Sequence, residues 1–245
     1  MKASTYLGIL GGLGPMSTVY FCELLNRHTA AACDADHIDM LISSKATTPD
    51  RTAYILDKNA PDPLPVMLAE AHRLENAGVD LIVVPCNTAH YFYDGLTKGC
   101  KTPILNIIEE TTAHLARIGV KTFGLLATVG TVQAGAYERF CAPRGLACVT
   151  PTMEEQAVIS NIIYGQIKQN KPVDMLAFDS VVNSLRSRGC EKIVLGCTEL
   201  SLLKKEGLDD NLFVDSLDVL AHRTILACGK TPVGFPISFD MEVAR

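Results

Sequence analysis

Two segments of the chain, 111 residues apart, have the same layout around a cysteine. The first reads DLIVVPCNT (80–88) and the second reads EKIVLGCTE (191–199). In each, an acidic residue opens an apolar run that ends at the cysteine, and small or polar residues follow at once. A glycine, Gly78 or Gly189, also stands eight residues before each cysteine. The repeated layout predicts that one β-strand and the corner after it occur once in each half of the chain.

The beginnings of the two halves match as well. LGILGGLGPMSTVYF (7–21) aligns with FGLLATVGTVQAGAY (123–137) at an offset of 116, which pairs Gly14 with Gly130. We therefore predict two similar lobes that face each other, with the ends of their strands meeting in a cleft. The alternative is chance similarity, because unrelated strands of α/β proteins share the same apolar character.

Short apolar runs alternate with longer segments of helical period. The expected strands are 6–10, 37–43, 80–84, 103–107, 122–127, 192–196 and 212–215. The expected helices are 17–30, 64–77, 108–118, 133–141, 153–169, 174–188 and 217–228. Strands that are apolar on both faces and separated by helices form parallel sheets. The predicted fold class is α/β, with a helix-flanked parallel sheet in each of two pseudo-symmetric lobes and the active site in the cleft between them.

Composition and cysteine spacing exclude several classes of protein. The net charge of −5 argues against nucleic-acid binding, which needs a basic face. None of the nine cysteines forms a Cys-x-x-Cys pair, so neither a zinc ribbon nor a thioredoxin-like motif is expected. No apolar run approaches the roughly 18 residues of a membrane span. We expect a soluble cytoplasmic protein with reduced thiols, no membrane contact and a small-molecule partner.

Cys86 and Cys197 fall where a strand gives way to a loop or helix, at the sheet edge where α/β proteins bind ligands. Free backbone N–H groups at such a corner favour an anion, so a thiol there can be held partly as thiolate. Residues that suit helix N-capping, or the binding of a substrate carboxylate, follow both cysteines: Asn87, Thr88, Thr198 and Glu199. The alternative is that each cysteine is a small apolar core residue, as most buried cysteines are.

Two thiols on opposite sides of one carbon suit the inversion of a stereocentre by proton transfer. One thiol acts as base and the other as acid, each within roughly 3–3.5 Å of the reacting carbon. A single nucleophilic cysteine would instead need a base beside it. His90 stands four residues after Cys86, but Ser201 occupies that position after Cys197. The duplication therefore favours the symmetric reaction.

The glycine-rich turn GILGGLGP resembles a dinucleotide-binding fingerprint only in part. Ser17 occupies the third glycine position, so we favour a tight turn at Gly12 that brings backbone close to a small ligand, over a nucleotide site. Two cations, Arg51 and Lys168, are candidates to hold a carboxylate if they face the cleft. The alternative is that both are solvated surface charges.

Taken together, GILGGLGP, TTPDRT, PCNTAH, GLLATVGT and GCTEL resemble the aspartate/glutamate racemase superfamily, and its aspartate racemase branch most closely. The resemblance covers residues 5 to 228, nearly the whole chain. The family fold implies a first lobe of residues 1–114 plus about 212–245 and a second lobe of residues 115–211. The resemblance also implies racemisation of an amino acid with no pyridoxal phosphate, no other cofactor and no metal, by an enzyme expected to be a homodimer.

The resemblance assigns roles to the candidate residues. Cys86 would remove the α-proton from the D-enantiomer and Cys197 from the L-enantiomer, and each would return a proton in the opposite direction. The α-carboxylate and amino group would be held by Asn87, Thr88, Thr128 and Thr198. Arg51 and Lys168 match the residues that read a side-chain carboxylate, which favours aspartate first and glutamate second.

Other activities are compatible with the same residues. Within the superfamily they are glutamate or broad-specificity amino-acid racemase, hydantoin racemase, and maleate isomerase, which uses its first cysteine as a nucleophile. Leu13 and Met16 stand where many relatives have methionine and glutamate, so the substrate preference stays open. Outside the superfamily, the alternatives are a protein that binds a dicarboxylate without turnover and a thiol redox protein.

Overall fold

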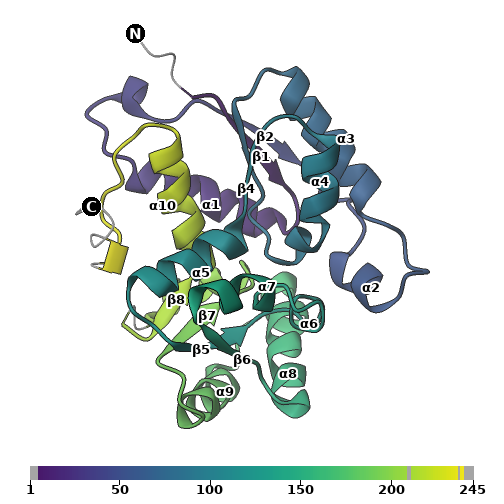
Figure 1. The fold of residues 1–245 in the computed structure, drawn as a ribbon, viewed down its shortest axis with the longest axis vertical. Coiled ribbons are helices and arrows are strands. Elements are labelled where there is room, and N and C mark those ends of the chain that lie inside the picture. The colour runs from purple at the N-terminus through teal and green to yellow at the C-terminus, as the bar shows by residue number, and fades with distance from the viewer. Residues whose placement is uncertain (1–4, 209–210, 237, 240–245) are drawn as a thin grey trace.

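The computed structural model of the chain describes residues 5–208, 211–236 and 238–239. Within these residues the strands form two four-stranded parallel sheets, each flanked by helices (Figure 1). The strand order is β2-β1-β3-β4 in the first sheet and β6-β5-β7-β8 in the second. The predicted α/β class with two helix-flanked parallel sheets is therefore confirmed.

The strands are β1 (Leu7–Gly11), β2 (Met40–Ser44), β3 (Leu81–Val83), β4 (Ile104–Leu105), β5 (Thr122–Leu126), β6 (Ala147–Val149), β7 (Lys192–Leu195) and β8 (Phe213–Asp215). The α-helices are α1 (Pro15–His28), α2 (Arg51–Leu56), α3 (Leu64–Asn76), α4 (Tyr93–Gly99), α5 (Ile107–Arg117), α6 (Val129–Gln133), α7 (Glu138–Cys141), α8 (Met153–Ser160), α9 (Met175–Ser187) and α10 (Ser216–Ala227). Short 3₁₀ segments are η1 (Asp34–Asp36), η2 (Thr88–Phe92), η3 (Ala142–Arg144), η5 (Ile167–Gln169) and η6 (Leu200–Glu206), and η4 (Asn161–Gln166) is a π-helix.

Every expected strand overlaps an observed strand, and the sequence pattern missed only short elements. Among these are β6, which has three residues, and α2 in the polar segment before the loop at 57–63. The helix expected over 133–141 is instead divided into α6 and α7. Gly135 lies between them with φ of 58°, a left-handed conformation that ends a helical run.

The internal repeat extends to the strand register. Gly8 of β1 pairs with Ile82 of β3, and Gly124 of β5 pairs with Ile193 of β7 in the same way. Both glycines allow a helix to pack closely, because an added Cβ would lie 3.4 Å from Leu74 of α3 in the first half and 3.0 Å from a side-chain carbon of Leu185, in α9, in the second. Leu74 and Leu185 are 111 residues apart, the same offset as the two cysteines.

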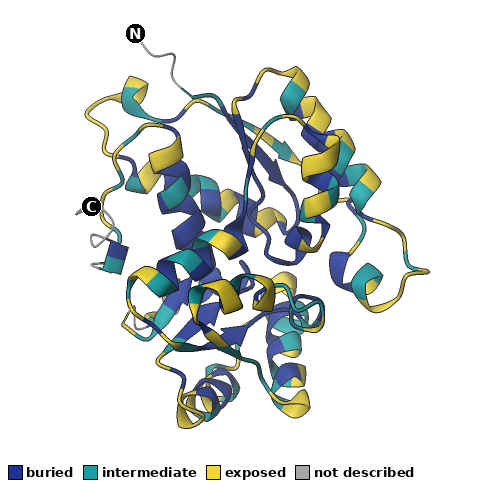
Figure 2. Ribbon diagram, in the orientation of Figure 1, coloured by how far each residue is buried: buried dark blue, intermediate teal, exposed yellow. Residues whose placement is uncertain are grey.

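The last helix of each half packs on the opposite half. Helix α10 contacts α1 and α5, while α5 contacts α7 and η3 (Figure 1). A central core therefore joins the two sheets, and buried side chains of β1, β5, α5 and α10 belong to it. Separate cores cover the outer faces, with Met67 in the first and Phe178 in the second. Figure 2 shows the strands and the inward faces of these helices buried.

The expected division into lobes stays a prediction, with one strand reassigned. Strand β8 lies at the start of the segment 212–245 that was expected in the first lobe, but it pairs in parallel with β7 of the second sheet. Helix α10, which follows it, packs against α1. We therefore place β8 with the second lobe and α10 with the first. Within the described ranges, no helix has both the length and the apolar character that crossing a bilayer requires.

Candidate functional site

The two cysteine corners meet between the sheets. Cys86 follows the carboxyl end of β3 and Cys197 follows that of β7, and both side chains are buried, at 6% and 4% exposure. The Thr198 hydroxyl donates a hydrogen bond of 3.2 Å to the carbonyl oxygen of Pro85. Residues next to each cysteine are therefore in direct contact across the two halves of the chain.

Glu199 connects Cys197 to a cation. The Cys197 thiol donates to one carboxylate oxygen of Glu199 at 3.0 Å, and the other oxygen accepts from the Lys168 ammonium. The loop before α1 lies against this group, since a Cβ added to Gly14 would stand 2.3 Å from Glu199 Oε1. Burial raises the pKa of Cys197 well above its ordinary value, and the charge and hydrogen bond of Glu199 raise it further. These influences favour the protonated thiol at Cys197.

Cys86 lies in a different electrostatic environment. Burial raises its pKa as well, but the positive charge of Arg51 is the largest opposing influence. Glu199 raises the pKa of Cys86 and Lys168 lowers it, as they do for Cys197. Both thiols are therefore close enough to share one set of charges. The sequence led us to expect partial thiolates, but burial outweighs the backbone N–H groups at these corners.

Arg51 is a buried cation whose hydrogen bonds, among the described residues, all go to backbone oxygens. Its guanidinium donates to the carbonyl oxygens of Leu13 at 2.8 Å, Pro49 at 3.0 Å and Thr48 at 3.3 Å. Its Nε atom is buried without a hydrogen-bond partner, and no carboxylate of the described residues pairs with it. A buried charge is costly unless it is paired, so this position favours an anionic ligand.

Three threonine hydroxyls form a cluster beside the first corner. Thr88 lies 2.9 Å from Thr128 and 3.0 Å from Thr131, and the last two hydroxyls are 3.0 Å apart. Thr128 is also the N-cap of α6, because its hydroxyl accepts from the Thr131 N–H. Thr88 and Thr128 were predicted from the sequence. Thr131 was missed, although its position three residues after the cap is the usual place of a capping partner.

The side chain of Asn87 does not cap a helix, contrary to our interpretation of the sequence. Its oxygen accepts from the Tyr137 hydroxyl at 2.7 Å, and its amide donates to Ser216 Oγ at 2.9 Å. Both partners are fully buried and come from the second half of the chain. Asn87 therefore ties the Cys86 corner to the N-cap residue of α7 and to α10.

Gly12 forms the tight turn that the sequence predicts. Its φ is 81°, and an added Cβ would lie 2.4 Å from the backbone nitrogen of Lys45. Its N–H donates to Thr18 Oγ1 at 2.9 Å, which ties the turn to the first helix. This turn carries Leu13, whose carbonyl holds Arg51, and Gly14, which lies against Glu199.

Lys168 reaches the site from an irregular helical segment over residues 153–169 that runs through α8, η4 and η5. The π-helix η4 carries Tyr164, whose hydroxyl donates to Thr52 Oγ1 of α2 at 2.9 Å. The negative charges of both cysteines, when ionised, would raise the pKa of Tyr164 and Lys168, so both side chains lie near both thiols. Sequence reasoning missed Tyr164, although it stands one helical turn before Lys168 on the same face.

A groove of about 560 Å³ lies beside this centre. Lys168 and Glu199 line it together with the first turn of α1, and its apolar rim includes Met16, Ile167 and Leu202. Because Glu199 bonds both Lys168 and the Cys197 thiol, the ion pair stands between the groove and Cys197. The structure thus gathers Cys86, Cys197, Arg51, Lys168, Thr198 and Glu199 around one point, with the threonine cluster and Asn87 beside Cys86.

Racemases are among the known proteins that the chain resembles in sequence and structure. The chain has a TM-score of 0.82 to aspartate racemase of Picrophilus torridus, at 29% identity over 94% of this chain and 96% of that one. It is 29% identical over 224 residues to the broad specificity amino-acid racemase RacX of Bacillus subtilis, which covers 89% of this chain and 96% of RacX. It is 31% identical over 160 residues to glutamate racemase of Aquifex pyrophilus, 60% of this chain and 58% of that enzyme.

The model of one family matches most of the chain. Its match runs from residue 10 to residue 224 and so includes both cysteine corners, the glycine turn, Arg51 and Lys168. The chain belongs to the Asp/Glu/hydantoin racemase family.

Proposed function

We propose that this enzyme racemises an acidic amino acid, with aspartate first and glutamate second, by a two-base reaction between Cys86 and Cys197. The observation that carries the proposal is that the two thiols share the charges of Lys168 and Glu199 where the two corners meet. The buried guanidinium of Arg51, which no described carboxylate pairs with, supports an acidic side chain in the substrate.

In the proposed reaction, one thiol accepts the α-proton as the other donates. In one direction Cys86, as thiolate, takes the proton from the α-carbon, so that the C–H bond breaks and an S–H bond forms. Cys197 then delivers its own proton to the opposite face of the carbon and becomes the thiolate. The next turnover in the reverse direction uses the two sulfurs in exchanged roles, so protons and charge balance over the cycle.

The surrounding charges lower the cost of these steps. Arg51 opposes the effect of burial on the pKa of Cys86 and so favours its thiolate. Lys168 opposes it at Cys197 and compensates Glu199, which otherwise would repel a thiolate at 3.0 Å. The hydroxyls of Thr88, Thr128 and Thr198, with the Asn87 corner, are proposed to hold the α-carboxylate and amino group. A closed, dry site strengthens each of these interactions.

The proposal is tested by incubating each enantiomer of aspartate and glutamate in deuterated water, followed by chiral analysis. We expect the opposite enantiomer to appear with deuterium at its α-carbon. Cys86→Ala and Cys197→Ala should each reduce racemisation by at least about 10³-fold, whereas Cys141→Ala, in the central core, should not. Binding of dicarboxylates without exchange or inversion would refute the proposal and favour the non-catalytic alternative.

A second candidate is a broader side-chain specificity within the same reaction. The apolar rim of the groove at Met16, Ile167 and Leu202 favours it, as does the 29% identity to the broad specificity racemase RacX. A panel of neutral and acidic amino acids in the same assay separates the two candidates. The cytoplasmic location and the homodimer expected from the sequence remain predictions.

A further inference from the structure

The junction between β8 and α10 is hydrogen-bonded to residues next to both cysteine corners. Ser216, the first residue of α10, accepts a hydrogen bond from Asn87 at 2.9 Å and donates one of 2.7 Å to the carbonyl oxygen of Leu195. Asn87 follows Cys86, and Leu195 is the last residue of the strand that leads to Cys197. The fully buried hydroxyl of Ser216 is therefore hydrogen-bonded both to the residue after Cys86 and to the strand that leads to Cys197.

Asp215, the residue before Ser216, holds the second corner directly. Its Oδ1 atom accepts from the Ser201 hydroxyl at 2.7 Å and from the Leu217 N–H at 2.8 Å. The first contact fixes η6, which begins immediately after Glu199, and the second makes Asp215 the N-cap of α10. The position of Asp215 is therefore coupled to Cys197 through η6 and to Cys86 through Ser216 and Asn87.

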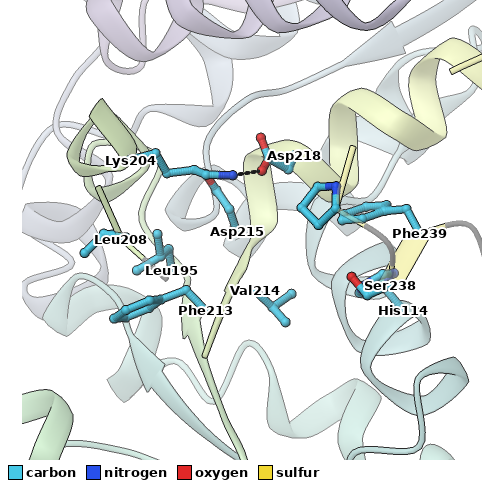
Figure 3. A pocket seen from close by; sticks show the side chains of 11 residues that line it. His114, Leu195, Lys204, Leu208, Phe213, Val214, Asp215, Asp218, Ser238 and Phe239 are labelled. Carbon is cyan, nitrogen blue, oxygen red and sulfur yellow. Dashed lines mark hydrogen bonds and ion pairs between the residues drawn. The ribbon is translucent and has the colours of Figure 1, made fainter. Parts of the chain in front are cut away.

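Asp215 has a second carboxyl oxygen, Oδ2, and the residue lines a small cavity of about 10 Å³ whose lining side chains are drawn in Figure 3. This Oδ2 atom is buried and has no hydrogen-bond partner among the described residues, and the whole side chain is only 5% exposed. The cavity walls are largely apolar, formed by Leu195, Leu208, Phe213, Val214 and Phe239. A carboxylate oxygen without a donor is costly in such a place.

The charges around the cavity do not compensate a second anion. Lys204, the described cation that lines it, already forms an ion pair with Asp218 (Figure 3). His114 of α5 also lines the cavity, and Tyr20 of α1 lies near enough for Asp218 and Asp215 to raise its pKa. Burial and then the charge of Asp218 raise the pKa of Asp215 to about 7, against the opposing effects of Lys204 and the two hydrogen bonds.

The first half of the chain has a neutral group at the same place. Asn106 is the N-cap of α5, 109 residues before Asp215, and its side-chain oxygen accepts from the N–H groups of Ile108 at 3.0 Å and Glu109 at 3.2 Å. An amide and a protonated carboxyl group have the same shape and the same charge. The duplicated position is thus compatible with a neutral cap in both halves.

We propose that Asp215 is a positioning residue for both cysteine corners, that it acts with its carboxyl group neutral, and that ionisation of this group slows the racemisation proposed above. Ionisation adds a second negative charge to a cavity whose cation is already paired, and so displaces α10 and η6. The proposal rests on the proposed function, because the effect on rate requires the two-thiol reaction.

The experiment compares Asp215→Asn and Asp215→Ala with the wild type. Asparagine keeps both hydrogen bonds and cannot ionise, so the ratio of its kcat to the wild-type kcat should rise several-fold between pH 6 and pH 8. Asp215→Ala loses the cap and the Ser201 contact, so its kcat should fall by about tenfold at every pH with little change in KM. If Asp215→Asn follows the wild-type pH profile, the proposal is overturned.

A second measurement is independent of activity. Because the folded-state pKa is raised, the native protein binds more protons than the unfolded chain between pH 4 and 7, and wild-type stability falls as pH rises through this window. The melting temperature of Asp215→Asn minus that of the wild type should therefore increase with pH up to about pH 7. Above that pH the difference should stay constant. Equal melting curves at all pH values would overturn the neutral carboxyl itself. Divergent curves in a protein that racemises nothing would instead overturn the proposed function and, with it, the link to rate.

Discussion

The two cysteine corners share a backbone plan and differ in the groups around each sulfur. The groups that support the Cys86 corner are the neutral imidazole of His90 and the amide of Asn106. At the Cys197 corner the corresponding positions of the repeat are occupied by Ser201 and Asp215. Cys86 lies near the cation of Arg51, which pairs with no carboxylate of the described residues, whereas the Cys197 thiol donates to Glu199. Duplication has therefore preserved the geometry that brings the thiols together while their affinities for a proton have diverged.

The histidine at the first corner shows how a neutral support is fixed. His90 Nδ1 lies 2.8 Å from the carbonyl oxygen of Cys86, which can only accept, so Nδ1 carries the proton. The Ile107 N–H lies 3.3 Å from Nε2, closer than the Leu105 carbonyl oxygen at 3.5 Å, so Nε2 is assigned as the acceptor. Burial lowers the pKa of His90, so the ring stays neutral over the ordinary pH range. Neither His90 nor Asn106 at the first corner changes its charge over the ordinary pH range, whereas Asp215 at the second corner does.

Removal of one thiol is expected to have the largest effect. With Cys197→Ser, racemisation should fall by at least about 10³-fold, while Cys86 continues to exchange the α-proton of a single enantiomer with deuterated water. Cys86→Ser should show exchange of the other enantiomer. Because the enantiomers have equal free energy, kcat/KM must remain equal in the two directions for any variant, so proton exchange is the measurement that separates the corners. Exchange of both enantiomers by one variant would contradict the opposed arrangement.

Arg51→Gln removes the cation from the first corner. We expect kcat/KM for aspartate to fall by about 10²-fold, because a charge-assisted contact to the substrate is lost. The pKa of Cys86 should also rise, since Arg51 is the main influence that lowers it. Alkylation of Cys86 should therefore reach a given rate only at a higher pH. Lys58→Gln removes an exposed cation elsewhere and serves as the control. Unchanged alkylation of Cys86 would show that Arg51 does not act on the thiol.

Glu199→Gln should make the two corners more alike. Glu199 raises the pKa of Cys197, so its neutralisation should shift the alkylation of Cys197 to lower pH, with a smaller shift in the same direction at Cys86. Mass spectrometry of alkylated peptides at a series of pH values measures both sites in one sample. Glu23→Gln, at an exposed ion pair on α1, is the matched control. A larger shift at Cys86 than at Cys197 would reverse the assignment of roles.

The smallest difference is expected at the paired glycines of β1 and β5. Gly8→Ala places a methyl group 2.9 Å from Val79, and Gly124→Ala places one 2.8 Å from Ile193. Overpacking of this kind costs about 1–3 kcal/mol, so both variants should lose similar amounts of unfolding free energy in chemical denaturation. Strongly unequal losses would show that the repeat is less regular in packing than in register.

The repeat made most of the fold predictable. The paired apolar runs indicated the central strands and both cysteine corners, because a strand buried on both faces has a continuous apolar signature. Strand β6 was missed, since three residues after Gly145 carry too little pattern to distinguish a strand from a loop. The division of 133–141 depends on the left-handed Gly135, a conformation that helical periodicity does not encode.

The site was predictable only where its residues follow a strand. Cys86, Cys197, Thr128 and Thr198 stand at strand ends, so their placement came from the topology. Tyr164 and the partners of Asn87 come from helices of the other half, and their contacts depend on how the lobes pack. The same holds for Asp215, whose role in a helix cap is local but whose cavity is lined by residues of β7, β8, η6, α5 and α10.

The reciprocal packing of α5 and α10 has a consequence for how such a molecule can be divided. The final helix of each half of the chain packs on the other half, so neither half is a self-sufficient folding unit. Fragments cut at residue 118 should stay unfolded when produced singly and assemble when produced together. A single-half ancestor with this topology would have needed a second copy of itself to complete its core.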